Sequence, residues 1–345
     1  MLDLITNENL AVNNATRRQN GDIFAHHKSL DDVSVFEHYA KIRRVPIEAV
    51  VPIRGFDGDL IQHPEPITKY SALYNDATGT VLETRPVADT YKLVPHDVMF
   101  KRSSDIIESS GLPLNDIDIY DNLYDGGRRS HRIVFFNDLK ETIADSSDVV
   151  RCRLDIFNSV DGTWKFQVFS GAYRDLCRNT QVFGGKKAYQ QSHKHTANLS
   201  PDAMVTKAGL ALQLWEGQVD AMRTWRMVRM DEEQFGEIIK ATVCKPKGAA
   251  AEHGARSQVN ERLYNYLIHR FREELPELGK TMWAGYNALT HWSTHVDEEY
   301  TTDDGKTYQT GKKTANKADV RRNRATDVRA VIESDGWKTL EGVAA

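Results

Sequence analysis

Apolar and polar residues alternate most regularly between residues 150 and 168, which predicts a pair of antiparallel β-strands. Over Val150–Phe157 the apolar side chains are separated by Arg151, Arg153 and Asp155, and a second alternating run follows the turn at Asn158–Gly162. A period of two places the two sets of side chains on opposite faces of a strand. The pattern therefore predicts one apolar face and one face that carries basic side chains.

A helix and a second hairpin are predicted before this pair. Proline is favoured in a first helical turn, and Gly111 stops helices, so a helix is expected from Pro95 to about Ser110. Asn115–Leu123 and Arg129–Asn137 flank the sequence Tyr-Asp-Gly-Gly, in which glycine permits the positive φ that tight hairpin turns need.

Apolar spacing changes to a helical period after residue 200. Ser200 followed by Pro201 is a typical helix start, and a stripe with spacings of three and four leads from Met204 to Met222. Further helices are expected at 231–243, 257–274 and 280–293, with Pro276 as an interruption.

These patterns predict an α+β fold: a central antiparallel sheet of hairpins packed by a long helix, with a mostly helical C-terminal third. The prolines between residues 46 and 93 predict short strands and loops there. The expected organisation is a flexible N-terminal arm (1–45), an α+β core domain (46–230), a helical region (231–304) and a basic C-terminal segment (305–345).

Composition adds few constraints. The 345 residues contain 45 Lys plus Arg and 49 Asp plus Glu, a net charge of −4, so any surface for a polyanion must come from local clustering. Cys152, Cys177 and Cys244 form no close pair and are interpreted as reduced structural thiols. No stretch has the roughly 18 apolar residues of a spanning helix. We therefore expect a cytoplasmic protein with no membrane partner.

Strict signatures of catalysis are absent. The sequence has no phosphate-binding loop, dinucleotide fingerprint, nucleophile elbow or zinc-protease motif, which argues against an enzyme and against a cofactor or metal. His193 and His195 lack an accompanying cysteine or carboxylate cluster. Asp57, Asp59 and Asp161 lie beside glycine, where turn formation is the simpler interpretation.

Three basic clusters are the main candidate binding residues, since phosphate binding requires only cations gathered on one surface. Each cluster is alternatively a solvated face or loop. The first cluster is the polar face of the predicted strand pair, with Arg151, Arg153 and Lys165, joined by Arg128, Arg129 and Arg132 from the preceding hairpin. The second is the stretch that follows, with interleaved aromatic residues and with Arg174, Arg178, Asn179, Lys186, Lys187 and Lys194. The third is the segment 305–324, which has seven cations, including Lys312, Lys313, Arg321 and Arg322, and one carboxylate.

Two segments carry a family resemblance. Asn158-Ser-Val-Asp-Gly162, followed by Arg174-Asp-Leu-Cys-Arg-Asn179, resembles the signature of the phage and plasmid-like family called domain of unknown function 932. Thr84–Val94 and Thr281–Thr290 resemble the early strand and the late helix of that family. The resemblance extends from about residue 45 to 335. It implies a setting in phages and mobile elements, and it assigns no active site to this chain.

Within the resembling segment, Arg174 and Arg178 stand four residues apart. In a helix they would share a face and could grip successive phosphates, with Asn179 offering a further hydrogen bond. A buried Arg174 paired with Asp155 or Asp175 is the open alternative.

The expected order of elements is also similar to the β-β-β-α core of phage single-strand annealing proteins. The leading hypothesis is therefore a non-enzymatic protein that binds single-stranded DNA and anneals it in homologous recombination, as a homo-oligomeric ring or filament in the bacterial cytoplasm. One alternative is a metal-dependent nuclease that uses Asp57, Asp59 or Asp155 with His193 or His195. Another is a phage factor that binds a host or phage protein, as a host-defence inhibitor or a virion component.

Overall fold

The computed structural model of the chain describes most of the predicted elements. The described residues are 15–17, 22–30, 36, 39–54, 60–109, 115–143, 148–174, 179–182, 190–193, 215–245, 260–296, 299–301, 307–309 and 317–342. The chain divides into two compact units. Unit 1 comprises Met1–Asp138, Leu154–Phe169 and Gln190–Leu212, and unit 2 comprises Leu139–Arg153, Ser170–Tyr189 and Gln213–Ala345.

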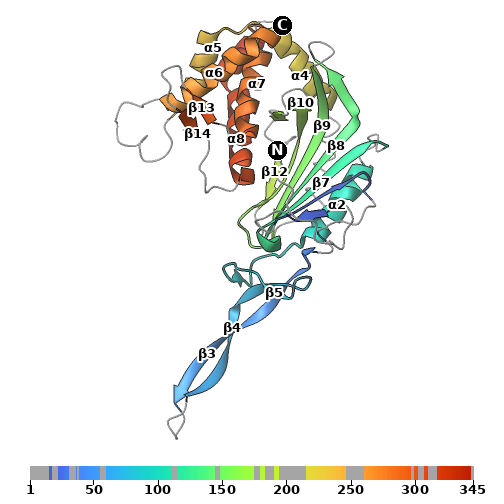
Figure 1. Cartoon of the computed structure of the whole chain (residues 1–345), viewed down its shortest axis with the longest axis vertical. Helices are drawn as coiled ribbons and strands as arrows, with labels where there is room; N and C mark the ends of the chain where they lie inside the picture. The colour runs from blue at the N-terminus through green and yellow to red at the C-terminus, as the bar shows by residue number, and fades with distance from the viewer. Residues whose placement is uncertain are drawn as a thin grey trace. The chain divides into compact units, whose positions relative to one another are not determined.

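The largest sheet has eight strands, and its order is β1-β2-β7-β8-β9-β10-β11, with β12 also paired to β10. Figure 1 shows β7 to β10 side by side. The strands are β1 (Ala15–Arg17), β2 (Ile23–His27), β7 (Ile117–Tyr124), β8 (Arg129–Thr142), β9 (Val149–Ser159), β10 (Phe166–Arg174), β11 (Asn179–Val182) and β12 (Gln190–His193). The predicted α+β class with its antiparallel sheet and helical C-terminal part is confirmed.

The two predicted hairpins are present, because their turn chemistry is local. Between β7 and β8 the short 3-10 turn Asp125–Gly127 (η1) places Gly126 at φ 65° and Gly127 at φ 97°. Between β9 and β10 Asp161 accepts a hydrogen bond from the backbone N–H of Thr163, and Gly162 adopts φ 74°. Positive φ costs glycine little, so both turns suit their sequences.

The segment expected to be an N-terminal arm contributes to the sheet. β2 pairs antiparallel with β7 from Ile23↔Leu123 to His27↔Ile119, and it buries Ile23 and Ala25. Its apolar residues alternate over only five positions, too few for the sequence to reveal a strand. Residues 23–27 therefore belong to the folded part of unit 1.

The proline-rich stretch forms a long ribbon instead of the expected short strands. β3 (Ile42–Arg54) pairs antiparallel with β4 (Leu60–Asn75), and β4 also pairs with β5 (Thr80–Val81) and β6 (Val87–Ala88). Figure 1 shows β3 and β4 as a twisted two-stranded ribbon. Prolines are tolerated because a two-stranded ribbon has two edges on which no N–H partner is required.

The helix expected after Pro95 is α2 (His96–Ser109), and it buries Met99, Phe100 and Ile107 within unit 1. Phe100 stacks on Phe36 with their ring centroids 3.9 Å apart. The apolar face of the helix thus supplies part of the core of this unit.

Unit 2 is mainly helical. Its helices are α4 (Trp215–Met227), α5 (Glu232–Ala241), α6 (Glu261–Leu278), α7 (Met282–Thr294), α8 (Lys317–Ile332) and α9 (Asp335–Gly342), with a small hairpin of β13 (Glu299–Thr301) and β14 (Thr307–Gln309). Every residue of α7 from Met282 to Ser293 is buried, so this helix is central to the unit.

Helix boundaries follow local signals with one exception. Asp231 and Gln234 form a capping box at the start of α5, and Thr281 caps α7. Trp215, Val219 and Met222 are buried as the predicted stripe requires, whereas the predicted start near Ser200 lies outside the described residues. The predicted break between the helices at 257–274 and 280–293 is present, but it falls at Gly279 rather than at Pro276. This proline lies in the last turn of α6, where one missing N–H removes a single hydrogen bond.

Candidate functional site

The basic face predicted on β9 is mostly covered. Val150, Cys152, Leu154 and Ile156 are fully buried, as the alternation predicts. On the opposite face Arg153 is only 9% exposed, and Arg151 is half-buried. A period of two predicts which residues share a face, but it does not reveal whether that face meets water.

Arg151 and Arg153 lie over the same aromatic ring in unit 2. Their guanidinium carbons are 5.7 Å and 6.0 Å from the ring centroid of Tyr173 on β10. Tyr173 is itself half-buried. A cation and the face of an aromatic ring attract each other electrostatically, and the same combination of groups binds phosphates and stacked bases.

Asp155, which follows on β9, is committed to a contact inside unit 1. Its Oδ1 accepts a hydrogen bond of 2.6 Å from Nε2 of His131 on β8. The imidazole stacks on Phe157 with centroids 3.9 Å apart, and the side chains of His131 and Asp155 are both buried. Asp155 is therefore explained by sheet packing and offers no support for a nuclease.

Arg132 does not lie on an open surface. Its Nε and Nη2 donate hydrogen bonds of 2.7 Å and 2.8 Å to the two carboxylate oxygens of Asp121, and both side chains are buried. Burial alone would raise the pKa of Asp121, but the adjacent guanidinium outweighs it and lowers this pKa. Arg132 is therefore a structural residue, contrary to its predicted role.

Arg128 and Arg129 remain partly exposed beside the hairpin turn of unit 1. Arg128 donates from Nε and Nη2 to Oδ2 of Asp161, each at 3.0 Å. Arg129 donates to Asp125 at 2.6 Å and lies over the ring of Trp164 at 5.1 Å. Lys165, the next residue along the chain, is exposed. Lys165 is therefore exposed, whereas Arg128 and Arg129 are partly exposed and paired with carboxylates.

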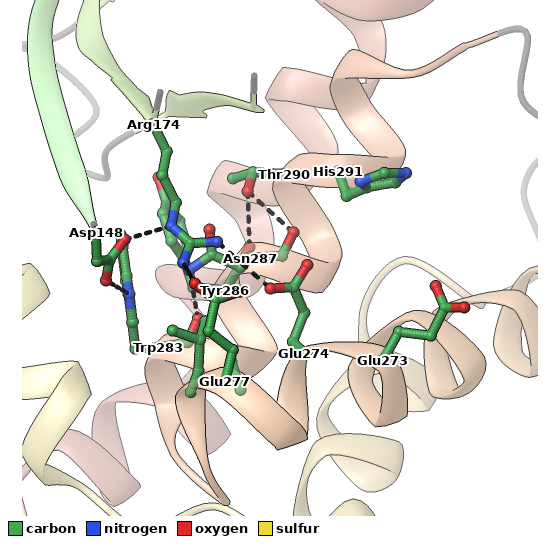
Figure 2. A network of polar contacts seen from close by, with 12 residues as sticks. Asp148, Arg174, Glu273, Glu274, Glu277, Trp283, Tyr286, Asn287, Thr290 and His291 are labelled. Atoms are coloured by element: carbon green, nitrogen blue, oxygen red, sulfur yellow. Dashed lines mark hydrogen bonds and ion pairs between the residues drawn. The ribbon is translucent and has the colours of Figure 1, made fainter. Parts of the chain in front are cut away.

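Arg174 is fully buried at the end of β10, and Figure 2 shows its guanidinium among three carboxylates of unit 2. Its Nε donates to Asp148, Nη2 donates to Glu277 at 3.0 Å, and Nη1 donates to Glu274 at 3.5 Å. Arg174 pairs across a strand ladder with Asn179, so this segment is a hairpin rather than the helix considered above. The alternative of a buried Arg174 is confirmed; its described partners are Asp148, Glu274 and Glu277, and Asp175 lies outside the described residues.

The Arg174 network continues along α6 and α7. Burial and the nearby carboxylates of Glu277 and Asp148 raise the pKa of Glu274, and they outweigh the opposite effect of Arg174 and Arg270. Arg270 in turn donates to Nδ1 of His291 at 3.1 Å. Figure 2 shows Glu274 on α6 and His291 on the neighbouring α7. The two arginines therefore do not fully offset the cost of burying the charged carboxylate of Glu274.

The late helix segment that resembles the family is also structural. Trp283 donates from Nε1 to Oδ2 of Asp148 at 2.9 Å, and Thr281 accepts a hydrogen bond from the backbone N–H of Ala284. Asn287 donates to the carbonyl of Trp283 at 2.8 Å, and Thr290 donates to that of Tyr286. These contacts fix α7 and its neighbours.

Asn158 has a similar role in unit 1. His96 donates from Nε2 to the carbonyl of Gly127 at 3.0 Å, so its Nδ1 accepts from Asn158 Nδ2 at 3.0 Å and from Ser130 Oγ at 2.7 Å. All three side chains are fully buried. The sequence carries no sign of this network, because its members come from three distant segments.

The basic C-terminal segment is partly used for packing. Arg324 is buried, donates to the carbonyl of Trp292 at 2.7 Å and lies over the ring of that residue at 5.0 Å. Arg321, which is exposed, donates to the carbonyl of Thr294 at 2.9 Å. Both arginines therefore satisfy carbonyls at the C-terminal end of α7, which also carries the negative end of the helix dipole.

Several predicted residues have no described side chain. Asn179 and Arg322 are described by their backbone alone, in β11 and α8, as is His193 in β12. The other predicted residues lie outside the described part of the chain: Arg178, Lys186, Lys187, Lys194, Lys312 and Lys313, together with Asp57, Asp59 and His195 from the alternative hypothesis.

Cys152 and Cys244 are free and buried. Burial raises the pKa of the Cys244 thiol to about 12 and shifts that of Cys152 upward as well. Both match the expectation of inert structural thiols, whereas Cys177 lies outside the described residues.

Potential metal ligands are scattered through the described part of the chain. No three or more of its histidine, cysteine, aspartate and glutamate side chains gather into a group that could hold a metal ion. Among the helices of the same ranges, none combines the length and apolar content needed to cross a membrane.

Comparison with known proteins gives one match. The family profile described as Domain of unknown function (DUF932) matches residues 84–327. No curated protein and no solved structure matches the chain. The matched range includes Asn158, Arg174 and Trp283. In the structure the side chain of each of these residues makes hydrogen bonds inside the fold.

Proposed function

The chain belongs to the family described as Domain of unknown function (DUF932), and for this member we propose a role as a DNA-binding protein of a phage or another mobile element. It holds single-stranded DNA in the bacterial cytoplasm and presents it for annealing to a complementary strand in homologous recombination. It needs no cofactor for this task, because annealing requires only that the backbone be held while the bases stay accessible.

The observation that carries the proposal is the placement of Arg151 and Arg153 over Tyr173. A single strand offers both a charged backbone and unpaired bases with two flat faces. The half-buried guanidinium of Arg151 supplies attraction for phosphates, and the half-buried ring of Tyr173 supplies a stacking surface, whereas Arg153 is nearly covered. This combination favours single strands, since the bases of a duplex are already stacked.

Unit 1 carries accessible cations of its own. Lys165 is exposed, and Arg128 and Arg129 are partly exposed, so each can contact phosphate. Arg132 and Arg174 are not part of the proposed surface, because their guanidinium groups are buried against carboxylates.

The test is fluorescence anisotropy of labelled single-stranded and double-stranded oligonucleotides with the full-length protein. Binding is measured from about 50 to 200 mM salt, because phosphate contacts weaken steeply over that range. We expect tighter binding to the single strand and a clear loss of affinity with salt. Absence of binding at the lowest salt, or equal affinity for both forms, would contradict the proposal.

A second assay separates binding from annealing. Complementary strands carrying a fluorophore and a quencher are mixed with and without the protein, and the rate of quenching is recorded. We expect the protein to accelerate quenching without a nucleotide or metal. Tight binding without acceleration would restrict the role to strand protection.

A further inference from the structure

The ion pair between Asp148 and Arg174 joins the two strands that carry the Arg151–Tyr173 cluster, which consists of Arg151, Arg153 and Tyr173. Asp148 immediately precedes β9, and Arg174 follows Tyr173 as the last residue of β10. Nε of Arg174 donates a hydrogen bond to Oδ1 of Asp148. β9 and β10 are neighbours in the sheet, and all five residues belong to unit 2.

Arg174 and Tyr173 lie on opposite faces of β10, because successive side chains of a strand point to opposite sides. Figure 2 shows the guanidinium of Arg174 among the carboxylates beside α6 and α7, where it is fully buried. Tyr173 is half-buried and has the guanidinium groups of Arg151 and Arg153 over its ring. The contacts that anchor the end of β10 are therefore separate from the surface proposed to bind DNA.

Asp148 is itself held in place by two further contacts. Its Oδ2 accepts a hydrogen bond from Nε1 of Trp283 at 2.9 Å, and its backbone carbonyl accepts one from the N–H of Ile143 at 3.0 Å. The side chains of Asp148 and Arg174 are both fully buried, so water does not compete for their ion pair. A buried hydrogen bond between charged groups is stronger than an exposed one, and it therefore keeps its geometry more strictly.

The Arg151–Tyr173 cluster requires such precision because its contacts have a short range. The guanidinium carbons of Arg151 and Arg153 are 5.7 Å and 6.0 Å from the ring centroid of Tyr173. A cation attracts an aromatic ring only within about 6 Å of its centroid. One residue of a strand spans about 3.3 Å, so even a partial slip of β10 along β9 would take the ring out of reach of one arginine.

We propose that Asp148 and Arg174 are positioning residues for single-stranded DNA, because their ion pair holds the ring of Tyr173 beside Arg151. A base can then stack on the ring while a neighbouring phosphate meets the guanidinium group. Asp148 and Arg174 are buried and do not touch the DNA themselves. This inference rests on the proposed function. It predicts that breaking the ion pair lowers the affinity for DNA and leaves the number of phosphate contacts unchanged.

The test is a double-mutant cycle on the affinity of the full-length protein for a labelled single-stranded oligonucleotide. Asp148→Asn keeps the size of the side chain but leaves one acceptor oxygen, so Arg174 and Trp283 can no longer both be bonded. We expect binding to weaken about tenfold, which is within the loss expected for removing a stacking ring, with an unchanged salt slope. In a Tyr173→Leu background the same substitution should have little further effect, because the ring that it positions is gone.

The matched control is Asp121→Asn in unit 1. Asp121 is likewise a buried carboxylate paired with a buried arginine, Arg132, so removing its charge should also destabilise the fold. The folded variant should bind DNA like the wild type, because this pair does not hold the Arg151–Tyr173 cluster. Thermal unfolding compares the stability of the two variants, and titration at high protein concentration gives the fraction of each that is able to bind.

A measurement without DNA tests the geometry of the cluster directly. The protein is labelled with 3-fluorotyrosine, and the fluorine NMR signal of Tyr173 is identified as the one that Tyr173→Phe lacks. We expect this signal to move in Asp148→Asn and in the milder variant Arg174→Lys, which keeps a positive charge but loses the Nε–H donor. It should stay in place in Asp121→Asn. Circular dichroism establishes that each variant is folded.

Three results would overturn the proposal. They are equal affinity of folded Asp148→Asn and the wild type, a loss of affinity from Asp148→Asn that is as large in the Tyr173→Leu background as in the wild type, and a Tyr173 fluorine signal that stays in place in both folded variants of the ion pair. Each of these results, obtained with a wild-type protein that binds single-stranded DNA, would leave the proposed function intact. A wild-type protein that does not bind single-stranded DNA at low salt would contradict the proposed function and this inference together.

Discussion

Trp283 donates a hydrogen bond of 2.9 Å from its indole Nε1 to Oδ2 of Asp148, and this contact joins positions that are 135 residues apart. The other oxygen of Asp148 accepts from Arg174. Two segments that carry the family resemblance, around Arg174 and around Trp283, therefore meet at one carboxylate that neither segment contains. Both segments are explained by packing within unit 2.

Trp283→Phe tests this junction. The substitution keeps an aromatic ring in the core but removes the N–H, so Asp148 loses one donor. A hydrogen bond to a charged group contributes about 1.5–3 kcal/mol, and we expect the free energy of unfolding to fall by that amount in urea denaturation. An unchanged denaturation midpoint would show that the contact adds no stability.

Arg174→Met should be more damaging. It removes the guanidinium that is bonded to Asp148, and it deprives the buried Glu274 of the same cation. Breaking a buried ion pair by removing one partner costs about 3–5 kcal/mol. Arg223→Gln, which removes an exposed guanidinium on α4, should cost little and serves as the control. Equal losses in the two variants would contradict the structural role of Arg174.

Glu274 gives stability a pH dependence of known sign. Its pKa is raised in the folded state, chiefly by burial, so the folded protein binds this proton more tightly than the unfolded chain. Its contribution to stability is therefore complete below the unfolded pKa, near 4.5, and is lost as pH rises through the folded pKa. Above the folded pKa the buried negative charge of Glu274 destabilises the folded protein.

The measurement is the difference in unfolding free energy between Glu274→Gln and the wild type as a function of pH. The neutral amide removes the buried charge, so the variant should gain relative stability as pH rises through the folded pKa of Glu274. The contributions of the other carboxylates to the pH dependence are shared by both proteins, so they largely cancel in this difference. A difference that is the same at every pH would contradict the buried, undercompensated acid.

The cysteines should be inert in the folded protein. Cys152 and Cys244 are fully buried, and burial raises the pKa of both thiols, so little thiolate forms near neutral pH. In a Cys177→Ser background, a thiol-specific reagent should react only after unfolding in denaturant. Rapid reaction of the native protein would show that one of these sites opens.

Local patterns were sufficient for most of the fold. The alternation in β9 and the glycines at 126 and 127 each act within a few positions, and the structure has the hairpins that they predict. The β3–β4 ribbon was missed because prolines usually break strands. They are accepted here since the ribbon has free edges.

The exposure and the ion-pair partners of individual arginines could not be predicted from local patterns. Arg151 and Arg153 alternate on one strand with the same sequence pattern, yet one is half-buried and the other nearly covered. Arg174 and Arg132 are neutralised by Asp148 and Asp121, whose positions depend on the assembled fold. A count of basic residues therefore overestimates the surface available to DNA.

The most direct test of the central claim compares the affinity of three full-length variants for single-stranded DNA. Tyr173→Leu removes the stacking ring and should cost about 1–3 kcal/mol of binding free energy. Arg151→Gln should weaken binding and reduce the salt slope by about one. Arg223→Gln removes an exposed arginine elsewhere in unit 2 and should bind like the wild type. Loss of affinity in the first two alone supports DNA binding at the Arg151–Tyr173 cluster. Equal affinity in all three folded variants would contradict it.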